Sequence, residues 1–171
     1  RLPRAIRDVY KRQDGVLGSK EAVSMIDTAV ETINSFDGKV FYTQDTHGED
    51  YLDTEEGRHL PVVHCIKGSE GWKIHPKIEK ALLLKGATGI EKSTFGSEKL
   101  MGIIEKEVPE VESITLIGIC TDICIISNAM LAKAHFQNTP VNVISSACAG
   151  VTPESHENAL AAMKMCHIEI Q

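Results

Sequence analysis

Short apolar runs alternate along the chain with longer stretches whose apolar residues recur every three or four positions. The runs predict buried strands at residues 39–43, 89–93, 114–119, 141–145 and 167–170. The longer stretches predict helices over residues 19–36, 77–84, 97–108, from 123 onward, and over 154–166. Strands that alternate with helices in this way indicate an α/β fold, with a parallel sheet covered by helices on both faces.

One long stretch, residues 44–76, follows neither period and is polar and rich in Gly and His. Loops of this length are uncommon inside a compact domain unless they have a function. We therefore expect functional residues in it.

The central strand, residues 114–119, leads into Thr121 and Asp122, which are residue types that start helices. Cys124 then falls in the first turn of the predicted helix. There the helix dipole and free backbone N–H groups would favour a thiolate, at the carboxyl edge of the sheet where α/β folds bind ligands. The alternative is that Cys124 is a small core residue.

Composition narrows the class of protein. The 171 residues are 42% hydrophobic and 25% charged, which is typical of one globular domain, and the net charge of −6 argues against a nucleic-acid partner. The sequence holds no apolar run of about 18 residues, so we predict no membrane span. The five cysteines are scattered without zinc-finger spacing, which favours a reducing compartment, and we predict a cytoplasmic protein. A homo-oligomer stays open.

Residues 1–13 differ from the rest, because they carry five basic residues and one acidic residue. They have the pattern of neither a strand nor a signal peptide. We interpret them as an atypical segment, either non-native or disordered, ahead of a single domain over residues 14–171. The first strand of the sheet would then be missing or replaced.

Candidate metal ligands gather after the strand at 39–43. Asp45 and His47 stand two apart, and the loop adds Asp50, Asp53, His59 and His64. Nitrogen and oxygen donors of this kind suit zinc, or alternatively manganese or iron. The alternative is a solvated acidic loop. For Cys65 we favour packing, and nothing in the sequence calls for an organic cofactor.

Lys92 ends the strand at 89–93. If the sheet order brings it near Cys124, its ammonium group would favour the thiolate and stabilise developing negative charge. Otherwise Lys92 is a solvated surface charge.

Five sequence blocks in the same order carry a resemblance to a known family. They are residues 14–18 (DGVLG), 45–47 (DTH), 60–68 (LPVVHCIKG), 91–95 (EKSTF) and 118–124 (GICTDIC). With these blocks the chain from Asp14 to Ile170 resembles the isochorismatase-like cysteine hydrolases, which include nicotinamidases. The resemblance implies a three-layer α/β/α fold with a mostly parallel, Rossmann-like sheet.

The resemblance also implies roles for individual residues. Cys124 matches the nucleophile and Lys92 the catalytic lysine. Ile119–Cys120 matches a non-proline cis peptide, with the N–H groups of Cys120 and Cys124 as the oxyanion hole.

For the metal, Asp45, His47 and His64 match the ligands of the family's metal-binding members. Asp53 stands where nicotinamidases place a further histidine. Nicotinamidases carry an aromatic residue three positions before the histidine that matches His64, and this chain has Pro61 there.

One expected residue has no match. The family's catalytic aspartate lies on the first strand, and counting back from Asp14 places Arg7 there, with Asp8 one position away. The general base is therefore predicted to be absent, which would impair this chain.

Taken together, the resemblance implies a cysteine-dependent amidohydrolase that acts on a small carboxamide through a thioester. Nicotinamide, converted to nicotinic acid and ammonia in NAD salvage, is the best guess. Two alternatives stay open: a ureido or carbamoyl amide hydrolase of the same superfamily, and a catalytically impaired binding or oligomerisation module.

Overall fold

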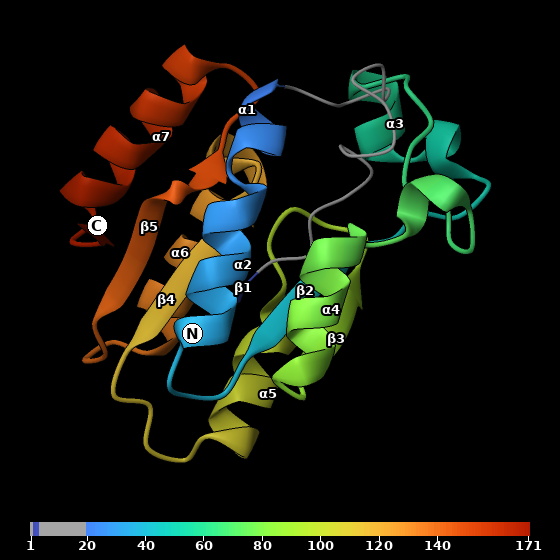
Figure 1. The fold of residues 1–171 in the computed structure, drawn as a ribbon. Coiled ribbons are helices and arrows are strands. Elements are labelled where there is room, and N and C mark those ends of the chain that lie inside the picture. Colours follow the sequence, from blue (N-terminus) through green and yellow to red (C-terminus); the bar gives the residue numbers. More distant parts are fainter. Residues whose placement is uncertain (1, 4–19) are drawn as a thin grey trace.

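Two groups of parallel strands form the centre of the fold in a computed structural model that describes residues 2–3 and 20–171 (Figure 1). The larger sheet has the order β1-β4-β5-β6 and the smaller one pairs β2 with β3. The strands of the larger sheet are β1 (Leu2–Pro3), β4 (Ile114–Ile119), β5 (Val141–Ala149) and β6 (Glu169–Ile170). Those of the smaller one are β2 (Phe41–Asp45) and β3 (Thr88–Lys92).

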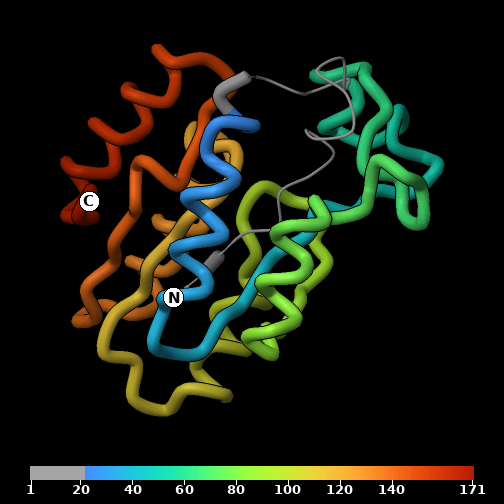
Figure 2. Tube along the Cα trace, viewed as in Figure 1, coloured from blue at the N-terminus to red at the C-terminus, as the bar shows by residue number. Residues whose placement is uncertain are grey.

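Helices cover both faces of the strands (Figures 1 and 2). One face packs against α1 (Lys20–Ser24), α2 (Ile26–Ser35) and α4 (Pro76–Leu84). The other face packs against α5 (Glu98–Glu107), α6 (Ile126–His135) and α7 (Pro153–Met165). The prediction of a parallel α/β fold with helices on both faces is confirmed.

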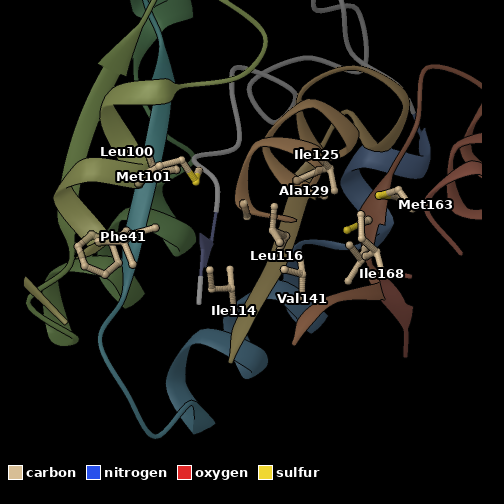
Figure 3. Close-up of a cluster of buried hydrophobic side chains, with 14 of the residues drawn as sticks. Phe41, Leu100, Met101, Ile114, Leu116, Ile125, Ala129, Val141, Met163 and Ile168 are labelled. Atoms are coloured by element: carbon tan, nitrogen blue, oxygen red, sulfur yellow. The ribbon is translucent and has the colours of Figure 1, made fainter. Parts of the chain in front are cut away.

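The central strand β4 shows why both faces are apolar. Ile114 and Leu116 point into the cluster with α5, α6 and α7, part of which Figure 3 shows. Ile117 and Ile119 point into the second cluster, with α2 and α4. Successive side chains of a strand point to opposite faces, so a strand buried on both sides is apolar almost without interruption.

Local structure departs from the predicted elements at three places. The helix expected over residues 19–36 is interrupted at Met25, between α1 and α2. The strand expected to end at residue 145 continues to Ala149. The long loop holds three short helical segments: η1 (Tyr51–Asp53), α3 (Glu55–His59) and η2 (Glu70–Trp72).

The N-terminal segment requires a correction. The prediction that residues 1–13 contain no strand is wrong at Leu2–Pro3, which pair in parallel with Leu116 and Ile117 of β4. The first strand is thus replaced rather than missing, since strands pair through their backbone groups. Arg7, Asp8 and the loop 14–18 lie outside the described residues.

Within residues 2–3 and 20–171, no helix combines the length and the apolar character that a bilayer crossing needs.

His75 illustrates how a buried polar residue starts a helix. Its Nδ1 accepts a hydrogen bond from the N–H of Lys77 (3.1 Å) and so caps α4, ahead of Pro76 in the first turn. The imidazole is buried. Burial and the nearby Lys77 ammonium lower the pKa of His75 from its ordinary value of 6.5, and Asp27 opposes this only in part. The cap therefore uses the neutral ring.

We expect this cap to make stability depend on pH. Since the folded pKa lies below the unfolded one, the stabilisation is complete above pH 6.5 and is lost as the pH falls below it. The variant His75→Asn keeps a capping acceptor without a titrating ring. Urea unfolding at pH 7.5 and 5.5 should show a larger loss of unfolding free energy for the wild type than for H75N. Equal losses in the two proteins would contradict this account.

Candidate active site and metal group

The centre of the candidate site is formed by two residues, each of which is the last residue of a strand. Asp45 is the last residue of β2 and Lys92 is the last of β3, and their Cα atoms are paired in the parallel register. Side chains at paired positions point to the same face, so the carboxylate and the amine meet. Lys92 Nζ donates a hydrogen bond to Asp45 Oδ1, and both side chains are 2% exposed. This ion pair was not predicted, because the sequence does not say that the two strands are neighbours.

Lys92 also reaches the candidate nucleophile. Its Nζ lies 3.6 Å from the sulfur of Cys124 and donates to the carbonyl of Thr94 at 2.7 Å. Cys124 itself is buried. The proximity of Lys92 and Cys124, which the sequence left open, is therefore present. The amine has three donor hydrogens, and these three contacts fix where it points.

The turn that carries Cys124 differs from the predicted one. The Ile119–Cys120 peptide bond is cis, at the position that the resemblance implied. The N–H groups of Ile123, Cys124 and Ile125 all donate to the carbonyl of Cys120, at 3.2, 3.1 and 3.1 Å. Residues Thr121–Ile125 thus form a π-helical turn, and α6 begins only at Ile126.

The helix-dipole argument holds only in part. Cys124 lies in the first turn of a helix that runs without a break from Thr121 through α6, but its N–H is already bonded to the carbonyl of Cys120. The charged group next to the sulfur is the Lys92 amine. The oxyanion hole at Cys120 and Cys124 stays a prediction, and it requires the Cys124 N–H to share or leave its bond to Cys120.

Asn128 ties the backbone of the candidate nucleophile to a second helix. Its side chain donates to the carbonyl of Cys124 at 2.8 Å and accepts from the N–H of Ser97 at 3.0 Å. Ser97 in turn caps α5, since its hydroxyl accepts from the N–H of Leu100. The start of α5 and the start of α6 are thereby held together next to Cys124.

A second cluster lies on the other side of Asp45. Asp45, His47, Glu56 and His64 each offer one ligand atom, and these atoms all lie within 4.8 Å of one another. His47 Nε2 lies 3.4 Å from Asp45 Oδ2, and Glu56 Oε1 lies 3.7 and 3.5 Å from the Nε2 atoms of His47 and His64. Two imidazole nitrogens and two carboxylate oxygens form a donor set that fits zinc, manganese or iron.

The histidines of this group are oriented by their surroundings. Nδ1 of His64 is hydrogen-bonded to the carbonyl of Val62 at 2.7 Å, which leaves Nε2 turned toward Glu56. The Tyr51 ring stands edge-on to His47 and His64, with centroids 4.7 and 4.9 Å away. Hydrogen bonds and packing of this kind fix a metal-binding imidazole in its productive orientation.

Glu56 takes part where Asp53 was expected. Asp53 is the last residue of η1. Like Asp50 and His59, it is exposed and does not belong to the group. Cys65 is also outside it and donates weakly to the carbonyl of Gly71 (3.7 Å), in keeping with packing. A cap at Thr54 followed by two glutamates could have indicated a helix inside the loop, and that helix turns Glu56 inward.

Close packing positions α3. The helix crosses the backbone of Tyr51 and Leu52 at Gly57, where a Cβ would come within 2.8 Å of the Leu52 Cα. Only glycine allows this approach. The backbone of α3 is therefore fixed one residue after Glu56.

The comparisons with known proteins give the family. The isochorismatase domain model matches residues 7–170, and the chain therefore belongs to the isochorismatase family. No curated protein sequence is significantly similar.

Solved structures show how widely the fold is shared. Among the similar ones are a nicotinamidase/pyrazinamidase of Bacillus subtilis (24% identity, TM-score 0.82, 99% of this chain and 97% of that one) and a pyrazinamidase of Pyrococcus horikoshii in complex with zinc (22%, 0.79, 99% and 96%). A third is the yeast nicotinamidase (13%, 0.84, 99% and 97%). At such identities the likeness shows the fold.

The metal group can be tested by exchanging its carboxylates one at a time. Glu56→Gln should lower the affinity for zinc by at least about tenfold, because it removes a charged donor from the group. Asp53→Asn, three residues away and exposed, serves as the matched control and should leave the affinity unchanged. Competition with a chelating dye gives both constants. A loss of affinity in D53N with none in E56Q would show that Asp53, as expected from the sequence, and not Glu56 is the ligand.

Proposed function

We propose that this protein is a thiol-dependent amidohydrolase that acts on a small carboxamide, with nicotinamide as the best candidate. The observation that carries the proposal is the position of the Lys92 amine, 3.6 Å from the Cys124 sulfur and in contact with Asp45. A cysteine that only filled the core would stay a neutral thiol, and a neutral thiol gains little from a buried ammonium group beside it. Membership of the isochorismatase family supports a hydrolase.

Lys92 and Cys124 can divide the reaction between them. The ammonium group stabilises the thiolate, and the sulfur adds to the carbonyl carbon of the amide. When the intermediate collapses, the amide nitrogen takes a proton from Lys92 and leaves as ammonia. Water then cleaves the thioester, and its proton returns to the Lys92 amine as the thiolate is released. Both side chains thereby return to the protonation states in which they began.

The N-terminal aspartate expected of the family is not needed for this balance. General-base catalysis is worth roughly 10²–10⁴-fold. A chain with Arg7 in place of the aspartate would therefore turn over more slowly than one that has it, and Asp45 would keep the Lys92 ammonium in place. We propose that this slower turnover is the consequence of the unusual N-terminal segment.

The metal group bears on the choice of substrate. Asp45, His47, Glu56 and His64 would hold a divalent ion, which supplies a Lewis-acidic point of attachment for a donor atom of the substrate. Asp45 belongs to both clusters, so that point lies close to Cys124. An amide on a ring with its own nitrogen donor, such as nicotinamide, suits this arrangement better than a simple ureido compound. The names of the structural neighbours, nicotinamidases and pyrazinamidases, agree with this choice.

Replacement of the nucleophile is the direct test. Cys124→Ala should abolish the release of ammonia from nicotinamide, because no thioester can form. Cys166→Ala is the matched control, since this thiol is exposed and far along the chain in α7's C-cap, and it should keep full activity. Ammonia release by C124A at the wild-type rate would exclude the proposed function.

Thiol alkylation tests the role of Lys92 without turnover. At pH 7 iodoacetamide should modify Cys124 faster than the exposed Cys166, when peptides from the same sample are compared by mass spectrometry. Lys92→Gln should slow the alkylation of Cys124 by about tenfold. The rate is proportional to the fraction of thiolate, and this fraction falls when the stabilising ammonium group is removed. Cys166 should not change. An unreactive Cys124 in the wild type would favour the alternative of an impaired binding module.

A further inference from the structure

The turn that carries Cys124 is attached to α7 through a pair of side chains that the proposed reaction does not use. Thr121 lies between Cys120 and Cys124 and is completely buried. Its hydroxyl is hydrogen-bonded to Nδ1 of His156, in the first turns of α7, at 2.8 Å. We propose that His156 is a positioning residue that acts through Thr121 to hold the sulfur of Cys124 beside Lys92. The proposal rests on the proposed function.

The contact is one of three that join the turn to the same segment. Ile119 is the parallel partner of Ala149, where β5 ends. Both carboxylate oxygens of Asp122 accept from the N–H of Val151, each at 3.2 Å. Three positions at the end of β4 and the start of the turn are thus held by three positions within residues 149–156, so Thr121–His156 is not an isolated contact.

His156 itself has little freedom to move. A Cβ at Gly150 would lie 2.9 Å from the Cβ and the backbone nitrogen of His156, so the first turns of α7 rest directly on the Gly150 backbone. The helix start is fixed by a capping box, in which Thr152 and Ser155 bond each other's backbone. The imidazole is therefore presented to Thr121 from a rigid support.

A shift of Thr121 would reach the sulfur through the backbone. The carbonyl of Thr121 accepts from the N–H of Ile126, and the carbonyl of the preceding Cys120 accepts from Cys124. Both bonds lie within the π-helical turn. If the hydroxyl loses its partner, the turn can relax, and the 3.6 Å contact between Cys124 and Lys92 is the contact that changes.

The test uses substitutions that keep volume but remove the bond. Thr121→Val and His156→Leu should each lower kcat for nicotinamide by about tenfold with KM nearly unchanged, because misplacement of reacting groups affects the chemical step. Each should also slow alkylation of Cys124 relative to Cys166. The double variant should be no slower than the single ones, since both remove the same bond.

Two further variants separate positioning from general stability. His156→Asn places an amide atom where Nδ1 lies and should restore most of the rate. His135→Leu is the matched control, because this histidine is bonded to Glu105 at the far end of α6, and it should leave Cys124 unchanged. If H156L fails to fold, T121V and H156N decide the question.

The proposal is overturned if alkylation of Cys124 in T121V equals that of the wild type, or if the losses in the double variant multiply. It is also overturned if H135L is as slow as H156L. Failure of the proposed function is a separate outcome: the wild type then releases no ammonia from nicotinamide, while the ratio of alkylation at Cys124 and Cys166 still reports on the bond between Thr121 and His156.

Discussion

The ion pair between Lys92 and Asp45 is the interaction on which the site depends. Both groups are buried at the ends of adjacent strands, so the loss of either leaves the other as an uncompensated buried charge, which costs about 3–5 kcal/mol in proteins. Lys92 extends the pair to Cys124, and the second oxygen of Asp45 faces His47. One carboxylate thus joins the candidate nucleophile to the candidate metal group, and neither cluster can be altered there without affecting the other.

Around this pair, the fold supplies support from several directions. Asn128 links the Cys124 backbone to the cap of α5, while Thr121 and Asp122 link the same turn to the start of α7. These attachments lie at the carboxyl ends of parallel strands, where loops converge and where ligands bind in sheets of this type. Placement of a single sulfur therefore involves elements from β2 to α7, which lie far apart in the sequence.

Membership of the isochorismatase family describes this scaffold more closely than it describes the substrate, because a fold hosts many chemistries and the site decides among them. Here the site combines a thiol, an amine and a mixed nitrogen and oxygen donor group. Glu56, which a short helix inside the long loop turns toward the histidines, takes the place that was expected for Asp53.

The sequence by itself determined the α/β class, the two-sided burial of the central strand and the local motifs that carry Cys124, Lys92 and the Asp45–His47 pair, because these depend on short-range periodicity and on residue types at fixed spacing. Only the tertiary structure decided which strands are neighbours, and hence that Asp45 meets Lys92. It also decided that the turn at Cys124 is π-helical, that Glu56 faces the histidines and that His156 reaches Thr121. Apart from the hydrogen bonds inside the turn itself, these facts arise from contacts between residues far apart in the chain, and no local pattern encodes such contacts.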